Sequence, residues 1–464
     1  MRQGSIDRLT GLLLAAITFL VILNEWNVLT AITPAKPVLV VLVVALLTLR
    51  VAPARQAFVG VAAALTLALV MTRPDWSDVT VKALASSAFI AAFFTSLSTL
   101  RNVAQTSPAI QAAGTFLSGQ PPGRRYAALT VGGQMFALLL NYGAIQLLGS
   151  LALANASSEP NAEVRGHRIR RMLLAIQRGF ISTLPWSPLS FAMAISVSVV
   201  PDTSWARSLV PGLITAGLLA GIGWALDTAF KPRLSKPPGP RSAPEGTWAT
   251  MLPLLMLLGV LVIGVVVLHE VSDVRIVGLV AVIVPSIALV WLLIQYWGDA
   301  PLANTARRAT DYVLRELPGY RGELTLLMMA GYIGTVGSAL LGPLMARAGL
   351  DLTVLPTWLI MVSFVWIIPL AGQIGMNPIL AVTLIAPLIP AASELGVTPT
   401  ALIVAITSGW ALSGASSPFT ATTLLIGSFG GLSATRVGLV WNGVYTVLCA
   451  TVLSAWVLLY AYVL

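Results

Sequence analysis

Residues 408–423 read SGWALSGASSPFTATT and interrupt sequence that is apolar and helix-like on both sides. Pro418 cannot donate a backbone hydrogen bond and the glycines loosen the helix, so amides and carbonyls near Ser413 and Ser417 lose their partners within the helix. Inside a membrane such a break is tolerated only where the backbone lines a protein-enclosed or wet cavity. The stretch therefore predicts a transmembrane helix that is broken at a binding site.

A stretch of the same kind occurs earlier in the chain, where residues 183–190 read TLPWSPLS. Its Ser-Pro-Leu-Ser corresponds to the Ser-Pro-Phe-Thr at 417–420. Paired breaks in two halves of a membrane protein are the sequence feature that best indicates the binding site of a secondary transporter. A Ser-Pro pair alone can be a simple kink whose serine bonds a preceding carbonyl. Its recurrence in matching places favours the functional interpretation.

The composition is that of a polytopic membrane protein. Of 464 residues, 57% are hydrophobic and 9% are charged, whereas a soluble domain has about 25% charged residues. The net charge of +10 is spread over loops, which indicates topogenic and lipid-facing charge rather than a nucleic-acid interface. Cys449 is the single cysteine and no Cys-His constellation is present. We therefore expect no cofactor and no metal site. Sodium is a candidate coupling ion if the protein is a transporter.

Apolar runs long enough to cross a bilayer define the predicted spans. They lie at 9–31, 37–52, 56–72, 83–100, 208–229, 248–268, 274–297, 322–345 and 437–462, and the broken spans at 179–200 and 400–428 raise their number to about 11. The predicted organisation is an extra first span at 1–36, repeat 1 at 37–230, a cytoplasmic linker at 231–247 and repeat 2 at 248–464. The basic segment 163–178 is expected to lie along the cytoplasmic surface.

Two further apolar segments are predicted to enter the membrane and return on the same side. Segment 126–156 carries no charge and has arginines on both flanks, so a re-entrant hairpin keeps both flanks in the cytoplasm. Its tip is Asn141-Tyr142-Gly143, and the alternative is one long tilted span. Segment 354–396 forms the second hairpin, with its tip in the sequence GQIGMNP at 372–378.

The distribution of basic residues places the N-terminus in the cytoplasm, and eleven spans then place the C-terminus outside. Each repeat comprises three spans, a hairpin, a broken span and a final span. Because each repeat crosses the membrane an odd number of times, the two repeats are inverted in topology. The sequence thus predicts an all-α membrane protein with the architecture of alternating access.

This organisation resembles the ion transporter superfamily: the divalent anion/sodium symporters, the large membrane subunits of tripartite dicarboxylate transporters, and their citrate and arsenite relatives. The likeness covers nearly the whole chain. Dicarboxylate members carry Ser-Asn-Thr at the hairpin tips, whereas the tips here read NYG at 141–143 and GMNP at 375–378, so the residues match in kind but the triplet does not. The resemblance implies a homodimer in which hairpins and broken helices form a transport domain that moves as an elevator against a scaffold.

The predicted site gathers two hairpin tips and two half-helix junctions. The half-helices that follow Pro188 and Pro418 would direct free amides at an anion, and the turns at Asn141 and Asn377 would offer oxygen ligands to sodium. The predicted substrate- and ion-binding residues are Asn141, Tyr142, Gly143, Ser187, Pro188, Ser190, Gln373, Asn377, Ser416, Ser417, Pro418 and Thr420.

The sequence predicts a non-enzymatic secondary active transporter of the bacterial inner-membrane type. It would move a small organic anion, a carboxylate or sulfonate, with sodium or protons. One alternative is a cation/proton antiporter or oxyanion efflux protein, which should need an essential acid, and none stands at the breaks. Another is an intramembrane lipid-linked transferase, but His167 and His269 are far apart in the sequence. The expected partners are the anion, membrane lipids and a second copy of the chain, without nucleic acid.

Overall fold

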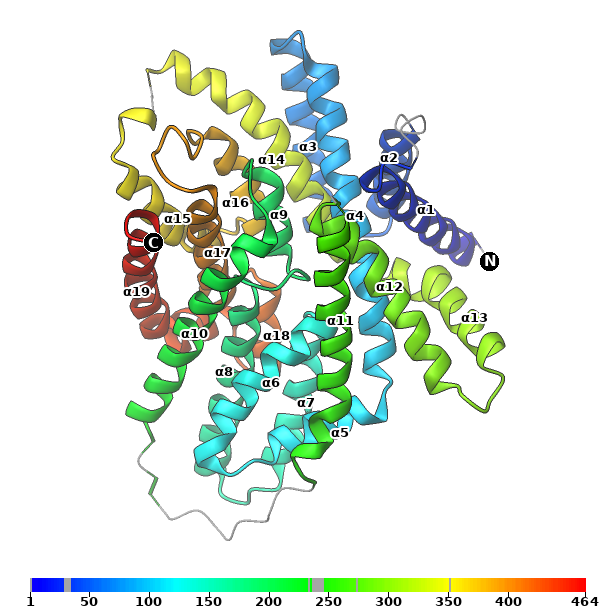
Figure 1. Ribbon diagram of the computed structural model, residues 1–464, viewed down its shortest axis with the longest axis vertical. Coiled ribbons are helices and arrows are strands. Elements are labelled where there is room, and N and C mark those ends of the chain that lie inside the picture. The colour runs from blue at the N-terminus through cyan, green and yellow to red at the C-terminus, as the bar shows by residue number, and fades with distance from the viewer. Residues whose placement is uncertain (1, 29–34, 233, 236–245, 273, 350–351) are drawn as a thin grey trace. The chain divides into compact units, whose positions relative to one another are not determined.

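The computed structural model consists of α-helices joined by short turns (Figure 1). It describes residues 2–28, 35–232, 234–235, 246–272, 274–349 and 352–464. These residues contain no strand, and nine of their helices are long and apolar enough to cross a membrane. The predicted class of all-α polytopic membrane protein is therefore confirmed, with nine such helices rather than about eleven.

The predicted unbroken spans all coincide with helices. They are α1 (Arg2–Glu25), α2 (Ala35–Thr48), α3 (Pro53–Thr72), α4 (Trp76–Gln105), α10 (Trp205–Ala229), α11 (Leu252–Val271), α12 (Ile276–Gln295), α14 (Arg321–Arg347) and α19 (Gly443–Tyr462). Two of the eleven predicted spans are not among the nine helices that are long and apolar enough to cross a membrane. The first is α2, which has only 14 residues, and the second is the first broken span, whose helix begins in basic sequence. The predicted linker at 231–247 lies mostly outside the described residues.

The chain forms two compact units. Unit 1 contains residues 1–103, 261–354 and 379–390, and unit 2 contains 104–260, 355–378 and 391–464. Each predicted repeat gives most of its first three spans to unit 1 and its tip and broken helix to unit 2. All twelve predicted site residues therefore lie in unit 2. The second predicted hairpin is divided, because α15 (Thr357–Gln373) belongs to unit 2 and nearly all of α16 (Pro378–Ile385) to unit 1.

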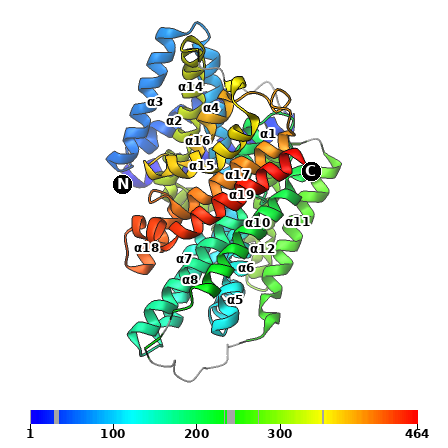
Figure 2. The same ribbon diagram turned by 90° about the vertical axis from the view of Figure 1, so that its left-hand side faces the viewer.

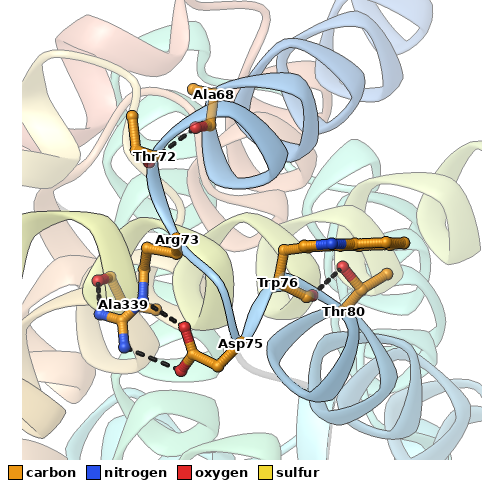
Figure 3. A network of polar contacts seen from close by, with 7 residues as sticks. All are labelled: Ala68, Thr72, Arg73, Asp75, Trp76, Thr80 and Ala339. Atoms are coloured by element: carbon orange, nitrogen blue, oxygen red, sulfur yellow. Dashed lines mark hydrogen bonds and ion pairs between the residues drawn. The ribbon is translucent and has the colours of Figure 1, made fainter.

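An ion pair closes the turn between α3 and α4 in unit 1 (Figure 3). Arg73 donates from Nε and Nη2 to the two carboxylate oxygens of Asp75, at 2.7 and 2.8 Å, and from Nη1 to the Ala339 carbonyl of α14 at 2.9 Å. The hydrogen bond from Arg73 lowers the pKa of Asp75. Because the pair is bidentate, it fixes the turn against α14 in one orientation.

Helices absent from the sequence-based prediction also occur. Segment 298–321, which connects the predicted spans 274–297 and 322–345, contains α13 (Pro301–Asp311), the π-helical turn η2 (Tyr312–Glu316) and the 3-10 turn η3 (Leu317–Tyr320). The helix α5 (Pro108–Ser118) precedes the first hairpin. Short 3-10 turns lie at η1 (Trp248–Met251), η4 (Leu352–Val354) and η5 (Ala386–Leu388). The buried Tyr312 hydroxyl donates to the Thr95 carbonyl at 2.7 Å, which anchors η2 to α4.

Unit 2 is built from two sets of packed helices. The predicted hairpin at 126–156 forms α6 (Pro122–Leu140) and α7 (Gly143–Ser157), and both pack against α8 (Ala162–Thr183). Figure 2 shows α15, α17 (Pro399–Ser416) and α19 side by side. The contacts are close: a Cβ on Gly179 would lie 2.4 Å from the Thr130 carbonyl oxygen, and one on Gly409 would lie 2.1 Å from that of Phe364.

The structure differs from the prediction at segment 163–178. It does not form a separate surface helix, because α8 runs unbroken from Ala162 to Thr183 and residues 172–183 are buried. The arginines are concentrated at 165–171 and the apolar run begins at Met172, so only the first turns of α8 are half-buried or exposed. The first broken helix therefore begins at residue 162 rather than 179.

Candidate functional site

The first break lies between α8 and the nine-residue α9 (Phe191–Val199). The Ser187 amide still donates to the Thr183 carbonyl at 3.0 Å, as in a helix. The helix α8 has already ended at Thr183, and Pro185 and Pro188 both lack an N–H. Ser187 Oγ accepts from the Leu189 amide at 3.1 Å. The Ser190 amide bonds back to the Ser187 carbonyl at 3.1 Å. The chain thus turns tightly within four residues before helix resumes.

The second break, between α17 and α18 (Ala421–Gly430), repeats this turn bond for bond. The Ser417 amide donates to the Ser413 carbonyl at 2.9 Å, Ser417 Oγ accepts from the Phe419 amide at 3.2 Å, and the Thr420 amide donates to the Ser417 carbonyl at 3.3 Å. Both turns carry proline in the same position. The correspondence between 187–190 and 417–420 is therefore structural as well as sequential.

The two breaks differ in how the following half-helix begins. Ser190 caps α9, since its Oγ accepts from the Met193 amide at 3.1 Å. Thr420 makes no such cap on α18 in the part of the chain that the structure describes. Its Oγ1 donates to the Ser417 carbonyl at 2.9 Å and lies 3.0 and 3.1 Å from the hydroxyls of Thr422 and Thr423. The N-terminus of α18 thus keeps amide groups that a ligand can use.

The second hairpin tip is bonded directly to the second break. Ser417 Oγ donates to the Gly372 carbonyl at 2.6 Å, and Gln373 Nε2 lies 3.3 Å from Ser416 Oγ. A Cβ on Gly372 would lie 2.6 Å from Ser413 Oγ. The Ser413 hydroxyl is fully buried and has no hydrogen-bond partner among the described residues. The end of α15 therefore rests on a buried row of serines at the end of α17.

The first hairpin tip contacts its own half. Asn141 closes α6 with φ of 49°, a value that few residues other than glycine adopt. The half-buried Tyr142 ring stacks on Phe180 of α8, with centroids 5.2 Å apart. Gly143 is buried and begins α7. This tip is thus fixed against the helix that leads into the first break.

The structure brings some of the predicted site residues together and leaves others apart. Gln373, Ser416, Ser417 and Thr420 form one bonded group around Pro418. Ser187, Pro188 and Ser190 form a second group at the first break, and Asn141, Tyr142 and Gly143 form the first tip. Asn377 is half-buried in the turn before α16. The breaks approach one another where α8 meets α17: a Cβ on Gly414 would lie 3.0 Å from Ile181 and 3.7 Å from Leu184.

Three buried polar residues behind the second break were not predicted. Gln177 and Arg178 of α8 are 0% and 4% exposed, and Asn442, which precedes α19, is 0% exposed. Gln177 and Arg178 belong to segment 163–178, which the sequence predicted to lie at the surface. Asn442, a single amide in an otherwise apolar stretch, is a signal that a closer analysis of the last span could have used.

The electrostatics of unit 2 favour negative ligands. Among the described residues of unit 2, Arg178 is the one charged residue that is buried as a whole, and the carboxylate of Asp227, whose side chain is 9% exposed, is paired with Arg171. The Arg178 guanidinium forms no ion pair within the described residues. A buried positive charge and the uncapped α18 both make the potential in this region more positive.

Comparison with known proteins supports the architecture and not a family. No family model matches the sequence, and no curated protein matches it. The fold of this polytopic membrane protein is similar to that of two solved structures of membrane transporters. The Alcanivorax borkumensis YdaH transporter, described as having an unusual topology, superposes with a TM-score of 0.54 at 14% identity, over 87% of this chain and 98% of that one.

A second similar structure is MtrF of Neisseria gonorrhoeae, described as illuminating a class of antimetabolite efflux pumps. It gives a TM-score of 0.52 at 13% identity, over 89% of this chain and 96% of that one. At these identities the likeness shows a shared fold. It agrees with the predicted class of polytopic membrane protein, while membership of the ion transporter superfamily stays a prediction.

Proposed function

We propose that the protein is a secondary active transporter of a small organic anion, a carboxylate or sulfonate, coupled to sodium or protons. The second break carries this proposal. There the α18 amides have no side-chain cap and the Thr420 hydroxyl and the buried serines of α17 lie beside them. Helix N-termini with hydroxyl donors are a common way to bind carboxylate and phosphate-like groups.

The division of the chain supports an elevator mechanism. Each repeat contributes its break and tip residues to unit 2 and most of its first spans to unit 1, as a mobile transport domain and a fixed scaffold require. The homodimer and the bacterial inner membrane follow from the resemblance to the ion transporter superfamily, which we retain as part of the proposal. The proposed orientation has a cytoplasmic N-terminus and an external C-terminus.

Coupling and direction are further parts of the proposal. No carboxylate stands at either break or either tip among the described residues, and the largely buried side chains of Glu25 and Asp227 are paired with Arg275 and Arg171. This favours sodium over a proton carried by an acidic side chain. Asn141 at the first tip and Asn377 at the second remain our proposed sodium-binding turns. The likeness to MtrF, an efflux pump by its description, makes export the direction to test first.

Thermal stabilisation tests the proposal. The purified protein is heated with succinate, citrate, benzoate, benzenesulfonate or sulfate, each in sodium, in potassium and at lowered pH. An anion that binds only the folded state raises Tm by mass action, corresponding to about 2.7 kcal/mol at a hundred times its Kd. We expect a sodium-dependent shift that is lost in Asn141→Ala and Asn377→Ala. A shift with cations or pH alone would instead support the cation/proton antiporter.

A further inference from the structure

The second break leaves two buried carbonyls without their usual donors. In a continuous helix the amide of residue 418 would bond to the Gly414 carbonyl, but Pro418 has no N–H. The Phe419 amide would bond to the Ala415 carbonyl, but it donates to Ser417 Oγ instead. Gly414 and Ala415 are both buried. Buried carbonyls of this kind need donors from elsewhere.

Gln177 supplies the missing donor from the other half of the molecule. Its Nε2 lies 3.4 Å from the Gly414 carbonyl oxygen and 3.3 Å from that of Ala415. The Thr422 hydroxyl also donates to the Gly414 carbonyl. Gln177 belongs to α8, the helix that leads into the first break. One half of the chain therefore completes the hydrogen bonding of the break in the other half.

The orientation of the Gln177 amide is set by a chain of hydrogen bonds that begins at Arg178. A guanidinium can only donate, and Arg178 Nε donates to Asn442 Oδ1 at 3.1 Å. Asn442 must then present its NH₂ group to Gln177 Oε1, 2.9 Å away. This leaves Gln177 Nε2 facing the two carbonyls, so every bond in the chain points from the arginine towards the break.

The other contacts of Arg178 are also with uncharged groups. Its Nη1 donates to the Tyr126 hydroxyl at 3.1 Å and to the Gly223 carbonyl at 3.4 Å, and its guanidinium carbon lies 4.3 Å from the centre of the Tyr445 ring. These bonds hold the guanidinium in place and leave its charge uncompensated. The π-helical turn η6 (Arg436–Trp441), which ends beside Asn442, also packs on the break, because a Cβ on Gly438 would lie 2.0 Å from the Ser416 carbonyl oxygen.

We propose that Arg178, Asn442 and Gln177 form a directional hydrogen-bond relay that positions the second break and gives it the polarity needed for an anion. The relay replaces the donor that Pro418 lacks. It also offsets the negative end of the α17 dipole, at the point where α18 presents its positive end. All three are positioning residues, since each acts through the break. The polarity part of this inference rests on the proposed anion transport, whereas the structural part does not.

Hydrogen exchange in the absence of ligand tests the structural part. In Gln177→Met the side chain keeps its length and loses its donor, so we expect amides in 414–423 to exchange on the order of fivefold faster. Gln56→Met is the matched control, because the Gln56 amide also bridges two backbone carbonyls, those of Thr48 and Val51, in unit 1. Exchange in 414–423 equal to wild type would overturn the relay. If Gln177→Met does not fold, Gln177→Asn, which is one methylene shorter, provides the comparison.

Asn442→Asp tests the polarity. The new carboxylate would pair with Arg178 and would also accept from Gln177, which forces the Gln177 amide to turn its oxygen towards the break. We expect an unchanged or higher Tm together with at least tenfold weaker binding of succinate or benzenesulfonate in calorimetric titration. An unchanged affinity of Asn442→Asp for these anions would show that the direction of the hydrogen bonds in the relay does not affect anion binding. If neither anion binds wild type, the proposed transport fails, and the exchange experiment still decides the relay.

Discussion

Ser187 and Ser417 occupy the same position in two equivalent turns, but their hydroxyl groups make different hydrogen bonds. Ser187 Oγ accepts a bond within its own turn. Ser417 Oγ accepts the equivalent bond and also donates to the Gly372 carbonyl at 2.6 Å, which joins α17 to the end of α15. Both side chains are buried. Comparing the two serines therefore distinguishes the contribution of the hydrogen bond within the turn from that of the hydrogen bond between α17 and α15.

Ser417→Ala should cost more stability than Ser187→Ala. Removing Ser417 Oγ takes the acceptor from the Phe419 amide and one of two donors from the buried Gly372 carbonyl, which keeps the Gly375 amide at 3.3 Å. Losing these two bonds should cost about 1–3 kcal/mol, whereas Ser187→Ala removes one local bond worth about 1 kcal/mol. Thermal unfolding of the two variants in the same detergent measures the difference. Equal losses would mean that the bond between α15 and α17 contributes nothing beyond the turn.

At the scale of elements, the crossing of α15 and α17 depends on the absence of a side chain at Gly409. A Cβ there would lie 2.1 Å from the Phe364 carbonyl oxygen, and backbone cannot move aside as a flexible side chain can. Gly409→Ala should therefore separate the helices and destabilise unit 2 by about 1–3 kcal/mol or more.

Gly217→Ala is the control for this substitution. Gly217 lies within α10 with nothing within 4 Å of an added Cβ, so alanine should be neutral or stabilise the helix by up to about 1 kcal/mol. Thermal unfolding of both variants gives the comparison. A Gly409→Ala protein as stable as Gly217→Ala would show that the helices are not in contact at this point.

The turn between α3 and α4 should respond to acid. Because Arg73 lowers the pKa of Asp75 in the folded protein, the ion pair contributes its stability above the ordinary carboxylate pKa and loses it as the pH falls through the lowered value. Asp75→Asn should remove this part of the pH dependence. Tm is measured for both proteins from neutral pH to below about 4, where the carboxylate titrates. Parallel curves would contradict the assignment.

The elements that the sequence predicted well are those whose signal is local. Continuous apolar runs predicted the spans, and proline with flanking hydroxyls predicted both breaks to within a few residues. Segment 163–178 alternates basic residues with apolar residues at helical spacing, a pattern that predicts a helix lying along the membrane surface. Arg178 stands inside the apolar run, seven residues beyond Arg171, and its burial depends on Tyr126 and Asn442 from distant parts of the chain. No local pattern contains that information.

At the scale of the whole molecule, the proposed elevator requires unit 2 to move relative to unit 1. Spin labels on Gln56→Cys in unit 1 and Asp202→Cys in unit 2 test this, since both residues are exposed. Cys449 is fully buried and can stay. We expect the distance distribution between positions 56 and 202 to change when sodium and a stabilising anion are added.

The pair 202 and 394 is the control, because Asp202 and Glu394 both belong to unit 2 and are exposed. Its distance should stay constant under the same conditions. A constant distance for both pairs would contradict the elevator, and a change within unit 2 alone would indicate a local gate.

The residues of the candidate site were predictable from the sequence, whereas the hydrogen bonds between them were not. The sequence placed hydroxyls and prolines at both breaks and asparagine at both tips. The direct bonds between the second tip and the second break, and the cap that only the first half-helix has, follow from three-dimensional packing. The similar motifs at 187–190 and 417–420 thus lie in different environments, and the similarity of their sequences does not reveal this difference.

The contact of Gln177 with Gly414 and Ala415 bears on the predicted relation between the two halves of the chain. If the repeats descend from one duplicated gene, the ancestral subunit had to meet its own copy through a symmetric pair of such contacts. Thr407 stands ten residues before Ser417, as Gln177 stands ten residues before Ser187. In the part of the chain that the structure describes, the Thr407 hydroxyl bonds to carbonyls of its own helix, those of Ile403 and Val404. On that hypothesis the two breaks have diverged, because the contact that α8 makes with the second break has no counterpart from Thr407 among the described residues.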